Sequence, residues 1–148
     1  MKKAIRHTFR FTQSPAEVWE YLTNPDLIEL WLMKSDFKLE LGHKFRFMGG
    51  CNHEDADSRE AASCEVLEIQ PNARLVYSWV TSSLNDEKPY TSTVTWTLRP
   101  DADGTELQLL HDGFMAIEDL SAHNDGWTRI GNKLAEKLNA LSYECTQA

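Results

Sequence analysis

The sequence lacks any long hydrophobic run, and no apolar stretch approaches the ~20 residues that a helix needs to span a bilayer. Residues 1–11 alternate charged and apolar side chains, so they do not have the pattern of a secretory signal peptide. Cysteines are few and odd in number, and Cys51, Cys64 and Cys145 lie far apart. Such spacing is typical of reduced thiols and not of a disulfide framework, so we expect a cytoplasmic protein.

Positive charge is also scarce, with fifteen Lys and Arg against twenty-three Asp and Glu, which gives a net charge of −8. Nucleic acids and anionic membranes are negatively charged, so long-range repulsion argues against both as partners, and no membrane insertion is expected. The chain contains no Gly-x-Ser-x-Gly elbow, no glycine-rich phosphate loop and no dinucleotide fingerprint. We therefore expect no cofactor.

Metal binding has one candidate segment, the polar loop at residues 51–58, which contains His53, Glu54, Asp55 and Asp57. The spacing of these side chains matches neither a calcium-binding loop nor a set of zinc ligands. Acidic residues in a loop are usually solvated, so the sequence predicts no metal site.

A long amphipathic helix is predicted over residues 121–141. Its apolar side chains recur at steps of three and four, as Trp127, Ile130, Leu134, Leu138 and Leu141. Gly131 lies on the same stripe, where glycine costs ~1 kcal/mol relative to alanine and often marks a close approach to the backbone. Two interpretations stay open: tight packing of the helix on a sheet, or a ligand cavity beneath the helix.

Most of the chain before this helix alternates between apolar and polar residues, as half-buried strands do. Two short helices are predicted after the first strand, one beginning at Ser14-Pro15-Ala16-Glu17 and the other at Asn24-Pro25. The pattern predicts six or seven antiparallel strands in total. A chain of 148 residues is expected to form a single α+β domain, with the long helix across the concave face of one sheet.

Several short motifs occur in order along the chain: Ser14-Pro15-Ala16-Glu17-Val18-Trp19, Asn24-Pro25, Trp31, Gly42 with Phe45-Arg46-Phe47, residues 68–71 with 74–79, residues 104–107, residues 111–114, and Gly126-Trp127. With this ordered set the chain resembles the helix-grip proteins of the START/Bet v 1-like superfamily, and most closely the branch related to the activator of Hsp90 ATPase. The resemblance implies a curved sheet that grips the long helix. It also implies a hydrophobic cavity between them, which members use for lipids, polyketides, hormones or other apolar small molecules.

The resemblance names an Hsp90-type chaperone as an alternative partner. In the activator of Hsp90 ATPase, which is a co-chaperone, the equivalent domain accompanies a separate module that binds Hsp90. We expect no second module in 148 residues. Such an accessory domain would use the acidic outer surface. The oligomeric state, a homodimer included, is left open by the sequence.

The favoured function is the binding of an apolar, possibly aromatic, small molecule for transport, sequestration or sensing. His111 follows Leu107 and Leu109 on the inward side of a strand pattern, so it is expected to supply a polar group at the mouth of the cavity, or else to tie down the turn before the helix. The predicted ligand-binding residues are Trp31, Phe47, Tyr77, Trp79, Trp96, His111, Phe114, Trp127 and Gly131.

The alternative is a cyclase-like or hydrolase-like enzyme that uses the same cavity. Acid–base chemistry needs at least two titratable groups that converge inside the cavity. The sequence places only His111 there, so binding is favoured and no catalytic residue is assigned.

Overall fold

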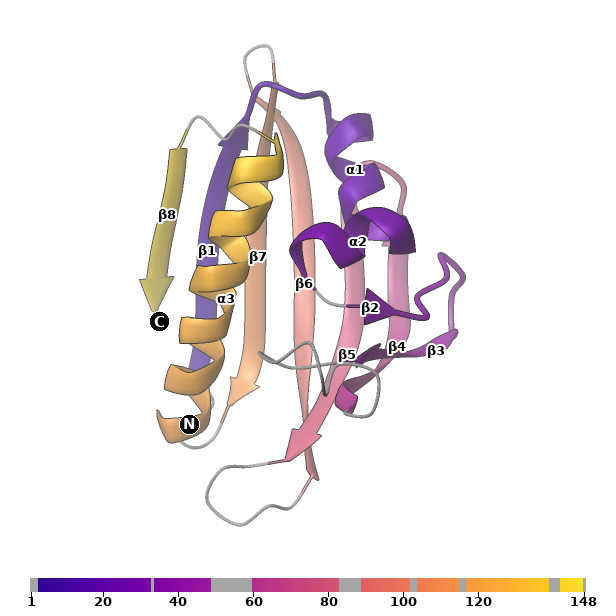
Figure 1. The fold of residues 1–148 in the computed structure, drawn as a ribbon, viewed down its shortest axis with the longest axis vertical. Helices are drawn as coiled ribbons and strands as arrows, with labels where there is room; N and C mark the ends of the chain where they lie inside the picture. The colour runs from indigo at the N-terminus through magenta and orange to yellow at the C-terminus, as the bar shows by residue number, and fades with distance from the viewer. Residues whose placement is uncertain are drawn as a thin grey trace.

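One antiparallel sheet curls around three helices (Figure 1). The computed structural model describes residues 3–32, 34–48, 60–82, 89–101, 104–114, 117–138 and 142–147. The elements in chain order are β1 (Lys3–Phe11), α1 (Pro15–Thr23), α2 (Pro25–Trp31), β2 (Lys34–Ser35), β3 (Lys44–Met48), β4 (Glu60–Gln70), β5 (Arg74–Ser82), β6 (Pro89–Asp101), β7 (Gly104–Phe114), α3 (Ile117–Leu138) and β8 (Ser142–Gln147). The strands lie in the order β2-β3-β4-β5-β6-β7-β1-β8, and the predicted helix-grip α+β fold is confirmed.

The two short helices begin where the sequence predicts. Ser14 Oγ accepts a hydrogen bond from the backbone N–H of Glu17 at 3.3 Å, the Glu17 side chain reaches back to Ser14, and Pro15 occupies the first helical position. Asn24 ends α1, where its backbone N–H donates to the Glu20 carbonyl oxygen at 2.9 Å. It also begins α2, because its Oδ1 accepts the backbone N–H of Asp26 at 3.0 Å. These caps fix the V of helices that follows β1.

The carboxyl end of the chain differs from the prediction. Helix α3 begins at Ile117, four residues before the expected start, and the strand β8 follows it. Strand β8 pairs antiparallel with β1, from Ile5↔Gln147 to Arg10↔Ser142. The segment is six residues long and mostly polar, so it carries too weak an alternation to predict a strand. Leu141, predicted on the helix, lies outside the described residues.

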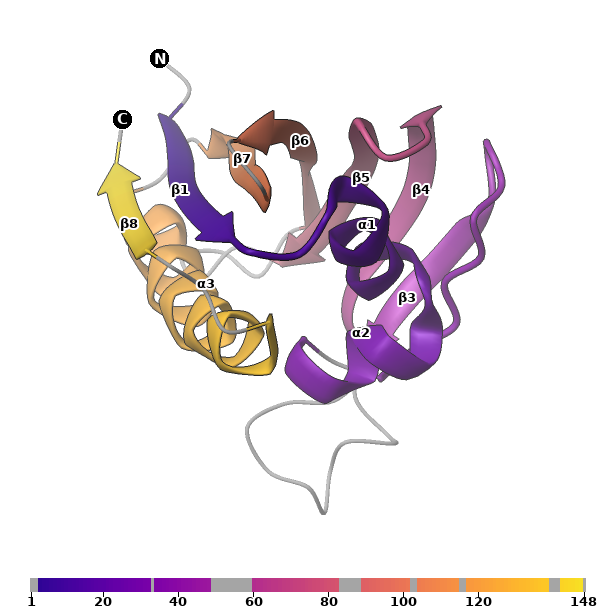
Figure 2. The same ribbon diagram turned by 90° about the horizontal axis from the view of Figure 1, so that it is seen from above.

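The helices divide the concave face between them (Figures 1 and 2). Helix α3 packs on β1, β7 and β8, whereas α1 packs on β6 and β7, and α2 contacts β2 and the side of α3. Between α2 and α3, aromatic side chains of both helices contact side chains of β5 and β6. None of the helices in the described part of the chain is both long and apolar enough to cross a membrane.

Gly104 and Gly126 differ in the space around their Cα atoms. A Cβ added to Gly104, at the start of β7, would lie 1.9 Å from the backbone oxygen of Phe11, where β1 and β7 approach each other. A Cβ added to Gly126 in α3 would meet no atom of the described residues within 4 Å outside its own helical turn. The first glycine is required by close packing, and the second only weakens the helix.

We expect the two alanine substitutions to shift stability in opposite directions. Gly104→Ala forces a backbone displacement and lowers the free energy of unfolding by at least the ~1–3 kcal/mol that overpacking typically costs. Gly126→Ala raises it by about 0.5–1 kcal/mol, because alanine favours the helix over glycine. Urea denaturation of both variants measures the difference, and equal effects of the two substitutions would contradict this packing.

Candidate functional site

The predicted site residues come together on the concave face. Their side chains are each at most 5% exposed, and Gly131 is buried in α3. Trp31 comes from α2, Phe47 from β3, Tyr77 and Trp79 from β5, Trp96 from β6, His111 and Phe114 from β7, and Trp127 and Gly131 from α3.

Four tryptophans from four elements form a continuous chain from α2 to α3. The ring centroids of Trp31 and Trp96 lie 5.8 Å apart, those of Trp96 and Trp127 5.7 Å, and those of Trp127 and Trp79 5.6 Å. The first two pairs meet edge to face, an arrangement that aromatic rings favour. We call these four residues the tryptophan seam, because they join the two helices across β5 and β6.

Phenylalanines of β3 extend this layer. The Phe47 ring lies 5.2 Å from that of Trp79, and Phe45 lies 5.2 Å from Tyr77. Phe45 was not predicted as a site residue, although its alternation with Phe47 places both on the same face. Tyr77 accepts a hydrogen bond from Trp96 Nε1 at 2.9 Å, and burial raises the pKa of its hydroxyl, which therefore stays protonated.

His111 is held by hydrogen bonds at both ring nitrogens. Trp127 Nε1 donates to His111 Nδ1 at 2.8 Å, and because an indole N–H can only donate, the proton of the imidazole must be on Nε2. His111 Nε2 then donates to Ser92 Oγ at 2.7 Å, and the Ser92 hydroxyl donates to the backbone oxygen of Trp79 at 3.1 Å. The resulting relay joins α3, β7, β6 and β5.

This relay keeps His111 neutral. Burial lowers the pKa of His111 well below its ordinary value of 6.5, and the neighbouring His123 lowers it further. Neither ring nitrogen has a free direction toward a bound molecule, so the hydrogen bonds favour the role of tying the helix to the sheet. A role for His111 in orienting a ligand stays a prediction.

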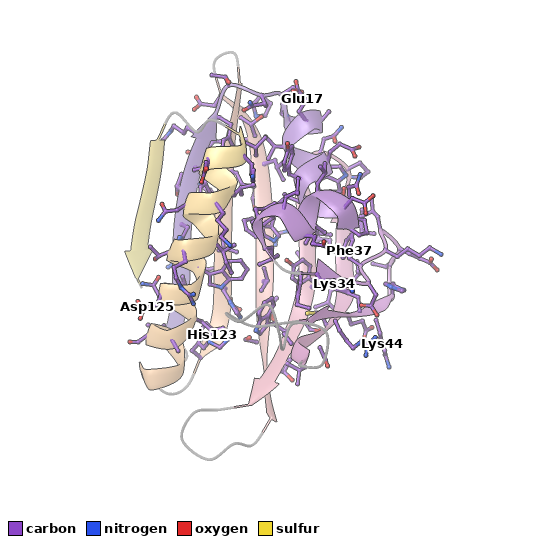
Figure 3. The ribbon with its side chains drawn as sticks, in the orientation of Figure 1. Glu17, Lys34, Phe37, Lys44, His123 and Asp125 are labelled. Carbon is purple, nitrogen blue, oxygen red and sulfur yellow. The ribbon has the colours of Figure 1, made fainter. Side chains whose placement is uncertain are left out.

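His123 is a candidate that the sequence analysis did not include. Its ring lies 5.0 Å from Phe114, 5.3 Å from His111 and 6.3 Å from Trp79, and the residue is only half-buried. Figure 3 shows His123 on the side of α3 toward the middle of the sheet and Asp125 on the opposite side. The signal in the sequence is its position four residues before Trp127, which puts both on one helix face.

The edge of α3 that carries His123 faces away from β1. Asn124 lies on the other edge, where its Oδ1 lies 3.1 Å from Nε2 of His7 in β1, and burial lowers the pKa of that histidine. Ile130, seven residues after His123, lies on the same edge as His123 and packs against the core while half-buried. His123 and Ile130 therefore lie along one edge of α3, on the side away from β1.

A hollow of about 290 Å³ lies on the other face of the sheet. Most of its lining side chains alternate with those of the aromatic layer, namely Arg6, Thr8, Arg74, Thr95, Thr97 and Gln108. Its remaining lining residues are His7, Leu109 and Leu110, and it is separate from the predicted site. Within the described ranges, no group of three His, Cys, Asp or Glu side chains lies close enough to hold a metal ion, and the loop with His53 falls outside those ranges.

The neutral state of His111 predicts a pH dependence of stability. In the unfolded chain the imidazole binds a proton below about pH 6.5, whereas in the folded protein it stays neutral to lower pH. The unfolded state therefore binds more protons, and stability falls as the pH drops below about 6.5, by up to about 1.4 kcal/mol per pH unit for this group.

We expect His111→Gln, which does not titrate, to reduce this slope between pH 6.5 and 5, as measured by urea denaturation at a series of pH values. The remaining slope includes His7, whose pKa is also lowered. An unchanged slope would show that His111 is not held neutral.

Comparison with known proteins gives a family and a set of similar structures. The family model described as "Activator of Hsp90 ATPase homolog 1-like protein" matches residues 12–139. The crystal structure of protein MLL2253 from Mesorhizobium loti is 33% identical, with a TM-score of 0.80 over 92% of this chain and 96% of that one. No curated protein matches.

Two further structures are similar. CalU16 from Micromonospora echinospora is 26% identical, with a TM-score of 0.72 over 90% of this chain and 74% of that one. DynU16, described as a putative protein in the dynemicin biosynthetic locus, shares the fold at 22% identity and a TM-score of 0.71, over 92% of this chain and 47% of that one. Because the family model spans most of the chain and the same fold recurs in these structures, the chain belongs to the Activator of Hsp90 ATPase homolog 1-like family.

Proposed function

We propose that the protein binds an apolar, aromatic small molecule between α2 and α3 on the concave face of the sheet. The observation that carries this proposal is the tryptophan seam. Its four indoles come from four different elements, so the boundary between the two helices is closed by rings. A flat molecule that replaces one ring contact keeps the aromatic packing.

The chemical character of this region suits a neutral ligand. The seam and its phenylalanine neighbours offer ring faces and edges, and the polar atoms of Tyr77 and His111 are bound to other side chains. Small-molecule sites are typically lined by apolar and aromatic side chains with few polar groups. The position of DynU16 in a biosynthetic locus supports a small organic molecule as the ligand class.

The same contacts favour binding over acid–base catalysis. A general base needs a free lone pair within reach of the substrate. The only unprotonated ring nitrogen of His111 accepts the Trp127 N–H, so using it would break the relay that holds α3. Among the described residues of this layer, His123 is then the histidine that borders the surface, and one such group does not form an acid–base pair.

A blocking substitution tests the proposal. Ile130→Trp places a large ring at the edge of α3 beside the seam, so we expect it to weaken saturable binding of the uncharged fluorescent probe N-phenyl-1-naphthylamine by at least about tenfold, through a loss of roughly 1.4 kcal/mol. Fluorescence titration measures the affinity.

The matched control is Asn132→Trp, which adds the same ring at an exposed position on the opposite side of α3. It should bind the probe as the unmodified protein does, and thermal unfolding checks that both variants fold. Equal affinity of both variants, or binding that does not saturate, counts against a site at the seam.

A further inference from the structure

One polar atom of the tryptophan seam has no hydrogen-bond partner among the described residues. Trp31 Nε1 donates to the backbone oxygen of Tyr21 at 2.9 Å, Trp96 Nε1 donates to Tyr77, and Trp127 Nε1 donates to His111. Trp79 Nε1 is buried, and no described residue offers it an acceptor. Trp79 therefore differs from the other three indoles of the seam in its hydrogen bonding.

An unpartnered buried N–H is costly, because the group loses its hydrogen bond to water on folding and gains none in return. Phenylalanine would fill most of the same space without this cost. Buried polar groups in native proteins are nearly always hydrogen-bonded, so an exception points to a partner that arrives from outside the chain.

We propose that the Trp79 indole N–H donates a hydrogen bond to a carbonyl oxygen of the bound molecule. This inference rests on the proposed function and specifies its ligand as a neutral aromatic ketone or a related carbonyl compound. The indole N–H can only donate, so the ligand atom must be an acceptor.

The surroundings of Trp79 favour a neutral acceptor over a carboxylate. Its ring contacts Phe47, Trp127 and the neutral His111, and at a longer distance of 6.3 Å the half-buried His123. A buried carboxylate needs a fixed positive partner to offset its desolvation, and the overall charge of −8 disfavours an anion further. His123 is the one titratable neighbour in this group of described contacts that could supply such a charge.

In this proposal Trp79, and not His111, makes the polar contact with the ligand. Both nitrogens of His111 are engaged, whereas the N–H of Trp79 is available without breaking any hydrogen bond of the relay. The Ser92 hydroxyl donates a hydrogen bond to the backbone oxygen of Trp79. This bond fixes the backbone of Trp79, from which the indole side chain extends. The donor is therefore positioned before a ligand arrives.

Two probes of the same shape test the inference. 2-Acetylnaphthalene carries a carbonyl oxygen, and 2-isopropenylnaphthalene has a methylene group in its place. We expect the unmodified protein to bind the ketone about tenfold more tightly, since only the ketone satisfies the buried donor. Trp79→Phe removes this preference. Trp19→Phe, the same substitution at a buried tryptophan of α1 outside the seam, retains it.

Indole N–H resonances provide a second readout. The chain has five tryptophans, and the Trp79 signal is the one missing from the spectrum of Trp79→Phe. It should shift downfield on addition of 2-acetylnaphthalene and not on addition of 2-isopropenylnaphthalene.

The outcomes separate the inference from the function on which it rests. Equal binding of the two probes, with the Trp79 resonance unshifted, overturns the role of Trp79 and leaves ligand binding standing. Tighter binding of 2-naphthoate than of the ketone overturns the neutral carbonyl. Failure of every probe to bind overturns the proposed function and the inference together.

Discussion

The relay from Trp127 through His111 and Ser92 to the backbone of Trp79 is the interaction on which the interior depends. It links one helix to three neighbouring strands by three hydrogen bonds, of 2.8, 2.7 and 3.1 Å, within an apolar layer. Such bonds are stronger in a medium of low polarity, and each is costly to leave unmade. The hydrophobic contribution to aromatic packing has no preferred direction. The relay therefore fixes the position of α3 on the sheet more sharply than packing alone.

This constraint separates the roles of the buried groups. His111 and Tyr77 are two buried titratable residues of the aromatic layer, and both are held neutral, the first by a lowered pKa and the second by a raised one. The Nε2 proton of His111 is donated to Ser92, and the Tyr77 hydroxyl oxygen accepts the Trp96 N–H. An interior of this kind offers ring surfaces and one spare donor, which suits recognition of a flat molecule better than proton transfer.

The fold could be read from the sequence because its signals are local. The cap at Ser14, the Asn24-Pro25 break and the strand alternation each depend on neighbours a few residues apart. For the predicted site residues, alternation identified which aromatic side chains face inward, but not which of their polar atoms are paired. That depends on register, which sets Ser92 opposite Trp79 and Val94 opposite His111. His123 and β8 were not predicted because their contacts are tertiary. His123 in α3 contacts His111 in β7, and β8 pairs with β1.

Strand β8 changes how the long helix can move. Helix α3 is joined to β7 at one end and to β8 at the other, and both strands are paired with β1. A helix with both ends tied to the same strand cannot swing out on a single hinge, so it does not act as a lid. Motion at the flank of α3 is then left to side chains, while the helix keeps its place between β7 and β8 in the chain.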